Sequence, residues 1–149
     1  MKKTRIALAG AGNIAQNAHL PAFAKREDVE VVAICDINLP RAEACAREFG
    51  IPAAFADAKE MIAQTDCDVV DICVWNRAHC EIAVAAAGRG RHILCEKPMA
   101  LNLEHARQMK EAVEEAGVTF MIAMPRRFFS EVQYIHRMIE SGKLGDVYY

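Results

Sequence analysis

The stretch Gly10-Ala11-Gly12-Asn13-Ile14-Ala15 decides the fold of this 149-residue chain. It follows a short apolar run at residues 6–9, and an acidic residue, Asp36, closes a second apolar run. In such a strand-turn-helix unit, the first glycine makes the tight turn and the second lets the backbone approach a pyrophosphate. The third position, here an alanine, keeps helix and strand close, and the helix N-terminus favours an anion. The pattern therefore predicts a dinucleotide site.

Asp36 follows Gly12 at slightly more than the usual spacing of about twenty residues, where a carboxylate accepts hydrogen bonds from an adenosine ribose. Its charge would repel a 2′-phosphate, so it favours NAD over NADP. Arg41 follows about one helical turn later and leaves NADP open. The alternative for Asp36 is a solvated acid at a strand end or a helix cap.

Composition is that of a globular domain. With 53% hydrophobic and 26% charged residues, the chain can bury a sizeable core. A net charge of −2, without a block of like charges, gives no electrostatic reason to expect nucleic acid or a membrane surface as partner. The apolar stretch behind the basic start is too short for a signal peptide, and no stretch has the length of a membrane helix. We expect a cytoplasmic protein.

The cysteines show neither a CxxC pair nor a paired ligand spacing. Most lie in or beside apolar runs, so we expect small buried hydrophobic side chains in a reducing compartment rather than disulfides or a zinc site. His79 beside Cys80 does not change this, because neighbouring residues on a helix point in different directions. The six are Cys35, Cys45, Cys67, Cys73, Cys80 and Cys95.

Strand and helix patterns alternate, which predicts a doubly wound α/β fold with a parallel sheet and helices on both faces. Strands are expected at 29–35, 53–56, 68–74, 93–95 and 119–123. Helices are expected at 39–49, 58–64, 78–87, 103–116 and 129–141, the last with an apolar face that should pack on the core. Ligands bind beyond the carboxyl ends of such strands. The site should therefore lie in the segments 10–13, 36–38, 75–79, 96–98 and 125–129.

The run His92-Ile-Leu-Cys-Glu96-Lys97-Pro98, with the glycine turn and His19-Leu-Pro21, resembles the Gfo/Idh/MocA oxidoreductases. Further matches are Asn76, His79, Arg127-Phe128 and residues 139–148, so the resemblance covers the whole chain. It implies an NAD(P)-dependent enzyme whose N-terminal Rossmann domain holds the cofactor. The cofactor site implied in this way comprises Gly10, Gly12, Asn13, Ile14, Asp36, Trp75, Asn76, His79, Glu96 and Lys97.

Lys97 matches the lysine that lies near the nicotinamide and the substrate hydroxyl, so the resemblance gives it the catalytic role. A lysine there can donate a hydrogen bond to the hydroxyl oxygen and assist proton transfer while hydride moves. Pro98 matches a position that often follows a cis peptide bond. The alternative for Lys97 is an ordinary solvated loop lysine.

Three further matches keep an alternative each. His79 suits either the cofactor cleft or a helix N-terminus without contact. Trp75 departs from the family's small residue or proline, and either stacks on the nicotinamide side of the cleft or simply packs. Arg127 matches an arginine near the substrate, with a surface ion pair as the alternative.

The resemblance also implies a domain organisation. Residues 1–124 are expected to form the Rossmann domain, and 125–149 a linking helix and the start of a truncated C-terminal α/β substrate domain. Asp146-Val-Tyr-Tyr149 should open its first strand. Because the rest of that domain is missing, we expect this chain alone to be inactive, and the full-length form to be a homo-oligomer.

The implied reaction is hydride transfer between NAD, less readily NADP, and a hydroxyl of a sugar, cyclitol or similar small polyol, without a metal. One alternative is a non-catalytic NAD(H)-binding module that acts in regulation or sensing. Another is a methyltransferase that binds S-adenosylmethionine in the same glycine turn. The run Glu96-Lys97-Pro98 argues against the methyltransferase, because methyl transfer has no use for it.

Overall fold

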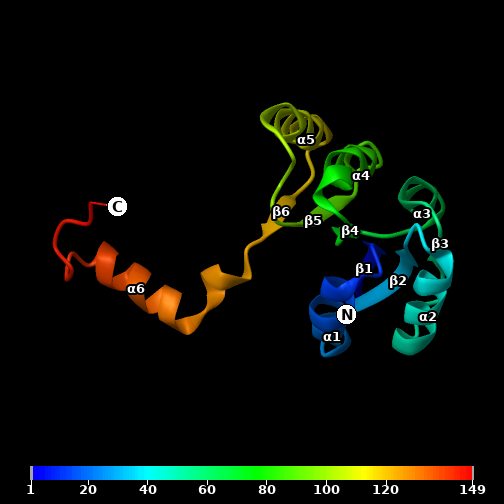
Figure 1. Ribbon diagram of the computed structural model, residues 1–149, viewed down its shortest axis with the longest axis horizontal. Helices are drawn as coiled ribbons and strands as arrows, with labels where there is room; N and C mark the ends of the chain where they lie inside the picture. The colour runs from blue at the N-terminus through cyan, green and yellow to red at the C-terminus, as the bar shows by residue number, and fades with distance from the viewer. Residues whose placement is uncertain (1, 149) are drawn as a thin grey trace.

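The computed structural model describes residues 2–148 and contains a six-stranded parallel sheet (Figure 1). Its order is β3-β2-β1-β4-β5-β6, and every strand pairs in parallel. This is the Rossmann order, in which the winding reverses between β1 and β4. The strands are β1 (Thr4–Ala9), β2 (Val29–Cys35), β3 (Ala54–Phe55), β4 (Val69–Ile72), β5 (His92–Glu96) and β6 (Phe120–Ala123). The predicted fold class is confirmed.

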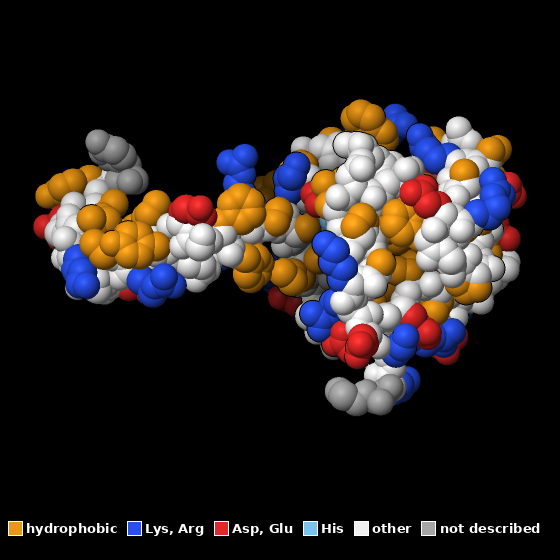
Figure 2. All heavy atoms as spheres, turned by 90° about the horizontal axis from the view of Figure 1, so that it is seen from below, with side chains coloured by type: hydrophobic (Ala, Val, Ile, Leu, Met, Phe, Trp, Pro, Cys, Tyr) orange, Lys and Arg blue, Asp and Glu red, His pale blue; other side chains and the backbone are white. Residues whose placement is uncertain are grey.

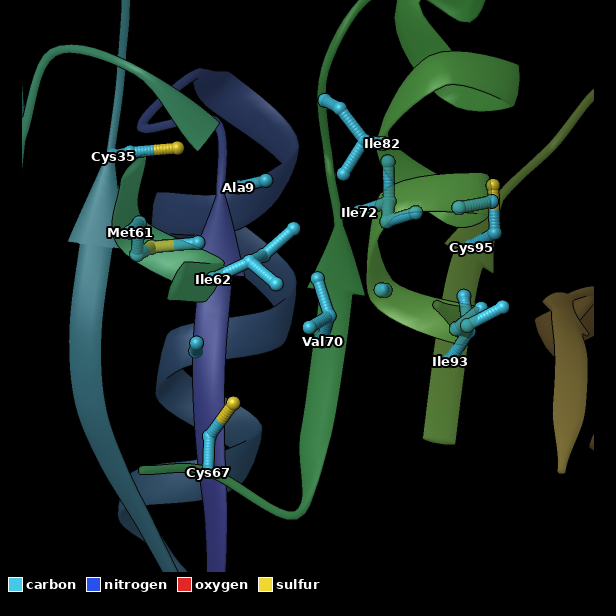
Figure 3. Close-up of a cluster of buried hydrophobic side chains, with 14 of the residues drawn as sticks. Ala9, Cys35, Met61, Ile62, Cys67, Val70, Ile72, Ile82, Ile93 and Cys95 are labelled. Atoms are coloured by element: carbon cyan, nitrogen blue, oxygen red, sulfur yellow. The ribbon is translucent and has the colours of Figure 1, made fainter. Parts of the chain in front are cut away.

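All helices but the last, which projects away, cover the two faces of the sheet. They are α1 (Leu20–Ala24), α2 (Leu39–Phe49), α3 (Ala58–Gln64), α4 (His79–Ala87), α5 (Leu103–Ala116) and α6 (Ser130–Glu140). Side chains of α1 and α2 pack against one face, and those of α3, α4 and α5 pack against the other. Figure 3 shows the second of these layers, where Met61 and Ile62 of α3 lie over β1 and β2, beside Val70 and Ile72 of β4.

Local caps set the ends of the best-predicted helices. The side chains of Asn38, Asp57 and Asn102 each accept a hydrogen bond from a backbone N–H in the first turn of α2, α3 and α5. α2 ends at Gly50 and α5 at Gly117, both in the left-handed conformation that glycine adopts without a steric penalty. The predicted bounds of α2, α3 and α5 are therefore confirmed.

The helix after the glycine turn contains a π-helical segment, Ala15–His19, which leads directly into α1. The backbone N–H of Leu20 donates to the carbonyl of Ala15, five residues earlier. Pro21 lies in the first turn of α1, where a missing N–H is tolerated. Such widened turns are frequent at functional sites.

All six cysteines are free and buried, which confirms the burial expected of them. Cys35, Cys67 and Cys95 belong to the core layer of Figure 3. Burial raises the pKa of Cys35 and that of Cys95 to about 12, so both remain thiols at neutral pH. Their chemistry is therefore that of small hydrophobic side chains.

Three strands are shorter than predicted, and one of them, β6, lacks only Thr119. β3 comprises only Ala54–Phe55, and β4 ends at Ile72, because a strand extends only as far as its neighbour pairs with it. After Ile72 the chain leaves the sheet and forms a 3₁₀ turn, Asn76–Ala78, before α4 begins at His79. These additional irregular residues contribute a wall of the candidate site.

The prediction that the last helix packs on the core is wrong. α6 projects away from the sheet in Figure 1. Figure 2 shows hydrophobic side chains exposed along this projecting C-terminal part of the chain. Val132, Ile135 and Ile139 are 41–52% exposed. An amphipathic pattern shows that a helix has an apolar face but does not say which surface covers it.

The expected strand at Asp146-Val-Tyr-Tyr149 does not form within the described residues. Residues 146–148 have no regular structure, and Tyr149 lies outside the described part of the chain. A strand needs a pairing partner, and apolar composition alone does not supply one. Within residues 2–148, no helix is both long enough and apolar enough to cross a membrane.

Candidate functional site

A cleft of about 720 Å³ lies at the carboxyl end of the sheet, where the winding reverses. This volume is within the range of small-molecule sites. It is lined by segments that follow β1, β2, β3, β4 and β5, so residues distant in sequence meet there. The predicted residues among the lining are Gly10, Gly12, Asn13, Ile14, Asp36, Trp75, Asn76 and Lys97.

The two glycines of the turn have different environments. Gly10 has φ +103°, and a Cβ atom there would lie 2.6 Å from the carbonyl oxygen of Cys73. The position therefore requires glycine, because the main chains after β1 and β4 nearly touch. At Gly12, a Cβ atom would meet no described atom within 4 Å. Gly12 thus leaves open a space at the helix N-terminus that a phosphate group fits.

Asp36 directly follows β2 at the cleft, with only 7% of its surface exposed. Its Oδ2 accepts hydrogen bonds from the backbone N–H of Ala11 and from Nε of Arg41, both at 3.0 Å. Its Oδ1 accepts from the backbone N–H of Asn38 at 2.9 Å and from Nη2 of Arg41 at 2.6 Å. These four donors match the approximately four lone-pair directions of a carboxylate.

The same contacts keep Asp36 ionised. Burial raises the pKa of this carboxyl, but the hydrogen bonds from Arg41, Asn38 and Ala11 more than offset burial and hold the pKa below its ordinary value. The site therefore has an ionised carboxylate just after β2, hydrogen-bonded to the guanidinium of Arg41.

Lys97 lies just beyond β5, on the opposite side of the cleft from Asp36 along the strand order. Its side chain is exposed, and the peptide bond from Lys97 to Pro98 is cis, as predicted. Trp75 is 81% exposed and Asn76 is half-buried, and both contribute to the wall that follows β4. Trp75 therefore does not pack into the core.

His79 does not line the cleft, contrary to what the resemblance implies. It is 1% exposed, and its two ring nitrogens face backbone carbonyl oxygens. Nδ1 lies 3.0 Å from the oxygen of Pro98, and Nε2 lies 3.1 Å from that of Val74. Because α4 starts at this residue, its ring points back between the two segments. His79 ties the wall after β4 to the wall after β5.

Glu96 is also set back from the cleft. It is 8% exposed, and its Oε2 accepts a hydrogen bond from the backbone N–H of Lys97 at 3.0 Å. Its Oε1 lies 3.2 Å from Nε2 of His19. Glu96 therefore acts on the site through the main chain of Lys97.

Arg127 lies outside the lining of the cleft, in a short 3₁₀ segment, Pro125–Phe128, between β6 and α6. Its side chain is exposed. The described residues offer it no acidic partner within ion-pair distance, so the alternative of a surface ion pair is not seen in this structure.

Three charged lining residues fall outside the predicted segments, Asp57, Lys59 and Glu81, and a fourth, Arg77, lies within segment 75–79 but was not named. Asp57 and Lys59 follow β3, so the rule that sites lie beyond carboxyl strand ends could have found them. Lys59 forms an ion pair with Glu81 that joins α3 to α4 beside the cleft. No motif marks this pair, because it depends on how the two helices pack.

The comparisons with known proteins agree with this geometry. A family model described as "Oxidoreductase family, NAD-binding Rossmann fold" matches residues 4–124. The chain is 34% identical over 144 residues to D-glucoside 3-dehydrogenase of Escherichia coli K12, covering 97% of this chain and 41% of that protein. It is 35% identical over 147 residues to glucose-6-phosphate 3-dehydrogenase of Bacillus subtilis, covering 99% of this chain and 40% of that protein.

Among solved structures, the WlbA dehydrogenase of Bordetella pertussis in complex with NADH and UDP-GlcNAcA superposes with a TM-score of 0.93 at 31% identity. The match covers 99% of this chain and 45% of that one. The chain thus spans about two fifths of the length of the curated relatives it matches. Taken with the strand order and the glycine turn, the family match shows that the chain belongs to the Gfo/Idh/MocA oxidoreductases and carries their NAD-binding Rossmann fold.

Proposed function

We propose that this chain holds the nicotinamide dinucleotide of an NAD(P)-dependent dehydrogenase that acts on a hydroxyl of a sugar, cyclitol or similar small polyol. The observation that carries the proposal is one cleft that brings the Gly10–Gly12 turn, Asp36 and Lys97 together at the reversal of the sheet. That point is where dinucleotides bind in sheets of this order.

The lining residues fit such a cofactor in three places. The open space at Gly12, beside Asn13 and Ile14, suits the pyrophosphate. Asp36 suits the adenosine ribose. Trp75, Asn76 and Lys97 are then left for the nicotinamide end, with Glu96 supporting Lys97 from behind and His79 supporting the wall.

Lys97 is the proposed catalytic residue. The bound nicotinamide would supply the hydride acceptor or donor. The ammonium group of an exposed lysine at the cleft can donate a hydrogen bond to the substrate oxygen and favour its negatively charged form. Substrate positioning and exclusion of water require more surface than this cleft provides.

We propose NAD as the preferred cofactor, with NADP as the weaker one. A buried, ionised Asp36 disfavours a 2′-phosphate at the end of β2. Arg41, however, is about half exposed and hydrogen-bonded to that acid, so it can turn toward a phosphate. The preference therefore depends on which of these two side chains faces the ribose.

The substrate class rests on relatives whose names specify glucosides, glucose 6-phosphate and myo-inositol. We also propose that residues 1–124 form the cofactor domain, that 125–149 link it to a substrate domain, and that Arg127 lies near the substrate in the complete enzyme. Pro125 marks this boundary, since the chain leaves the sheet at Ala123 and α6 extends away from it.

The first test is calorimetric titration of the chain with NAD, NADH and NADPH, repeated on Asp36→Ala. We expect tighter binding of NAD and NADH than of NADPH, with the preference lost in the variant. The matched control is Asp28→Ala, which removes an aspartate paired with Arg26 at the exposed surface. Absence of binding of any dinucleotide to the wild-type chain would contradict the proposal for this domain.

The second test uses this chain joined to the substrate domain proposed above. There, Lys97→Ala should abolish turnover of polyols while NAD binding persists, and Lys110→Ala on the exposed face of α5 should change neither. Binding of NAD without turnover in the unmutated protein would instead favour a regulatory or sensing module.

A further inference from the structure

His19 bridges two buried acids at the carboxyl end of the sheet. Its Nδ1 lies 2.8 Å from Oδ2 of Asp71, and its Nε2 lies 3.2 Å from Oε1 of Glu96. Asp71 is fully buried, and the side chains of His19 and Glu96 are each 10% exposed. The thiol sulfur of Cys73 lies within 4.8 Å of the nearby ligand atoms of His19 and Asp71.

The fold explains why these residues meet. Side chains alternate between the two faces of a strand, and Val70, Ile72, Ile93 and Cys95 all belong to the core layer under α3, α4 and α5. The acids Asp71 and Glu96 therefore point to the opposite face, on the neighbouring strands β4 and β5. His19 ends the π-helical segment that precedes α1, on that same face.

The hydrogen bonds restrict the protonation of the cluster. A carboxylate only accepts hydrogen bonds, so the imidazole can donate to both acids only when each ring nitrogen carries a proton. Burial lowers the pKa of His19, but its contacts with Asp71 and Glu96 outweigh burial and raise the pKa. Burial also raises the pKa of Asp71, so the contact between Asp71 and Nδ1 of His19 keeps its one proton, on either the carboxyl group or the ring.

The carboxylate of Glu96 connects the cluster to the cleft segment that follows β5. Oε1 of Glu96 faces His19, and Oε2 accepts the backbone N–H of Lys97 at 3.0 Å. A carboxylate held at both oxygens has little freedom to rotate. The main chain of Lys97 is therefore held by a series of contacts that runs from Asp71 through His19 to Glu96.

We propose that His19 and Asp71 are positioning residues: the imidazole, bonded to both acids, fixes the Glu96 carboxylate that holds the main chain of Lys97 at the cleft. The role assigned to Lys97 itself rests on the function proposed above. Neither His19 nor Asp71 lines the cleft, so both act through Glu96.

The test measures the Lys97 backbone amide by NMR in the chain without any dinucleotide, for wild type, His19→Gln and Asp71→Asn. A glutamine at position 19 can donate to one acid but presents an oxygen to the other. We expect amide hydrogen exchange at Lys97 to accelerate by roughly tenfold or more in His19→Gln, while amides of the central strands β1 and β2 change by less than about threefold. The matched control is His136→Gln, whose imidazole faces Glu140 on α6 and should leave Lys97 unchanged.

A folded His19→Gln variant with an unchanged Lys97 amide would overturn the proposal. The wild-type chain supplies a second measurement that needs no variant, the ¹⁵N shifts of the His19 ring at pH 7. We expect a proton on Nε2, facing Glu96, and an Nε2 without a proton would also overturn the proposal. Because no dinucleotide is present, these outcomes are independent of the titrations that test the proposed function.

Discussion

Arg41 holds both carboxylate oxygens of Asp36, through Nη2 at 2.6 Å from Oδ1 and Nε at 3.0 Å from Oδ2. With the backbone donors of Ala11 and Asn38, the acid already accepts four hydrogen bonds. A ribose hydroxyl must therefore compete with Arg41 for Asp36. The side chain of Arg41 is 47% exposed, so it has room to move aside.

Replacing Arg41 should sharpen the cofactor preference. In Arg41→Gln, Asp36 keeps its negative charge and loses its competing guanidinium, so we expect NAD affinity to be retained or improved. NADPH loses the cation that could meet its 2′-phosphate, and the ratio of the two dissociation constants should shift by roughly tenfold toward NAD. Calorimetric titration measures the ratio. Arg26→Gln, which breaks an exposed arginine–aspartate pair, is the control, and an unchanged ratio in Arg41→Gln would contradict this account.

Asp36 should also make the protein acid-sensitive. Because the pKa of the folded-state carboxyl lies below its ordinary value of 3.8, its contribution to stability is present above that value and is lost as the pH falls through the folded-state pKa. Asp36→Asn should cost roughly 1–2 kcal/mol near neutral pH, and the cost should shrink below about pH 4. Urea unfolding of both proteins from pH 3 to 7 measures it. Asp146→Asn, in the exposed C-terminal segment, is the control, and its free energy of unfolding should differ little from that of the wild type at every pH.

The two glycines of the turn should separate folding from binding. Gly10→Ala would force a Cβ atom to 2.6 Å from the main chain of Cys73 at a positive φ, and should lower the free energy of unfolding by roughly 2–4 kcal/mol. Gly12→Ala meets no described atom, so its stability should stay within about 1 kcal/mol of wild type. The added methyl group would occupy the approach to the pyrophosphate, however, and NAD affinity should fall at least tenfold. Thermal unfolding and calorimetry of both variants test this contrast, and equal effects of the two on stability would refute it.

The exposed face of α6 should contribute little to the stability of the sheet domain. Ile135→Lys places a charge on a side chain that is already 52% exposed, and should change the free energy of unfolding by less than about 0.5 kcal/mol. Met109→Ala in α5 removes a fully buried side chain and should cost roughly 2–5 kcal/mol. Urea unfolding of the two variants compares them. A large loss in Ile135→Lys would mean that α6 packs on the domain in solution.

Much of the fold could be predicted because its signals are local. Asn38 and Gly50 bracket α2 by capping interactions within a few residues of each end, and β2 is apolar at every position except Glu30. The place of Asp36 followed from the glycine turn and the spacing behind it. The length of β4 could not be predicted in the same way, because it depends on where the neighbouring strands stop pairing.

The contacts within the site depend on tertiary structure. His79 finds its acceptors at Pro98 and Met99, about twenty residues away, and the motif that suggests a cofactor contact does not reveal this. The bond from His19 to Asp71 spans 52 residues and exists only because β1 and β4 are neighbours in the sheet. Residue types at strand ends indicate where a site lies, and packing decides which side chains face it.

The bracket that His79 forms between the segments after β4 and β5 has a consequence for binding. Because the buried ring of His79 lies between the carbonyl oxygens of Val74 and Pro98, at 3.1 and 3.0 Å, the wall bearing Trp75 and the loop bearing Lys97 pack against one shared side chain. The distance between these two segments is therefore set when the polypeptide folds, before a ligand binds. A ligand that binds between them does not lose binding free energy to the ordering of these segments, so its affinity depends on how well its shape and charge match the cleft.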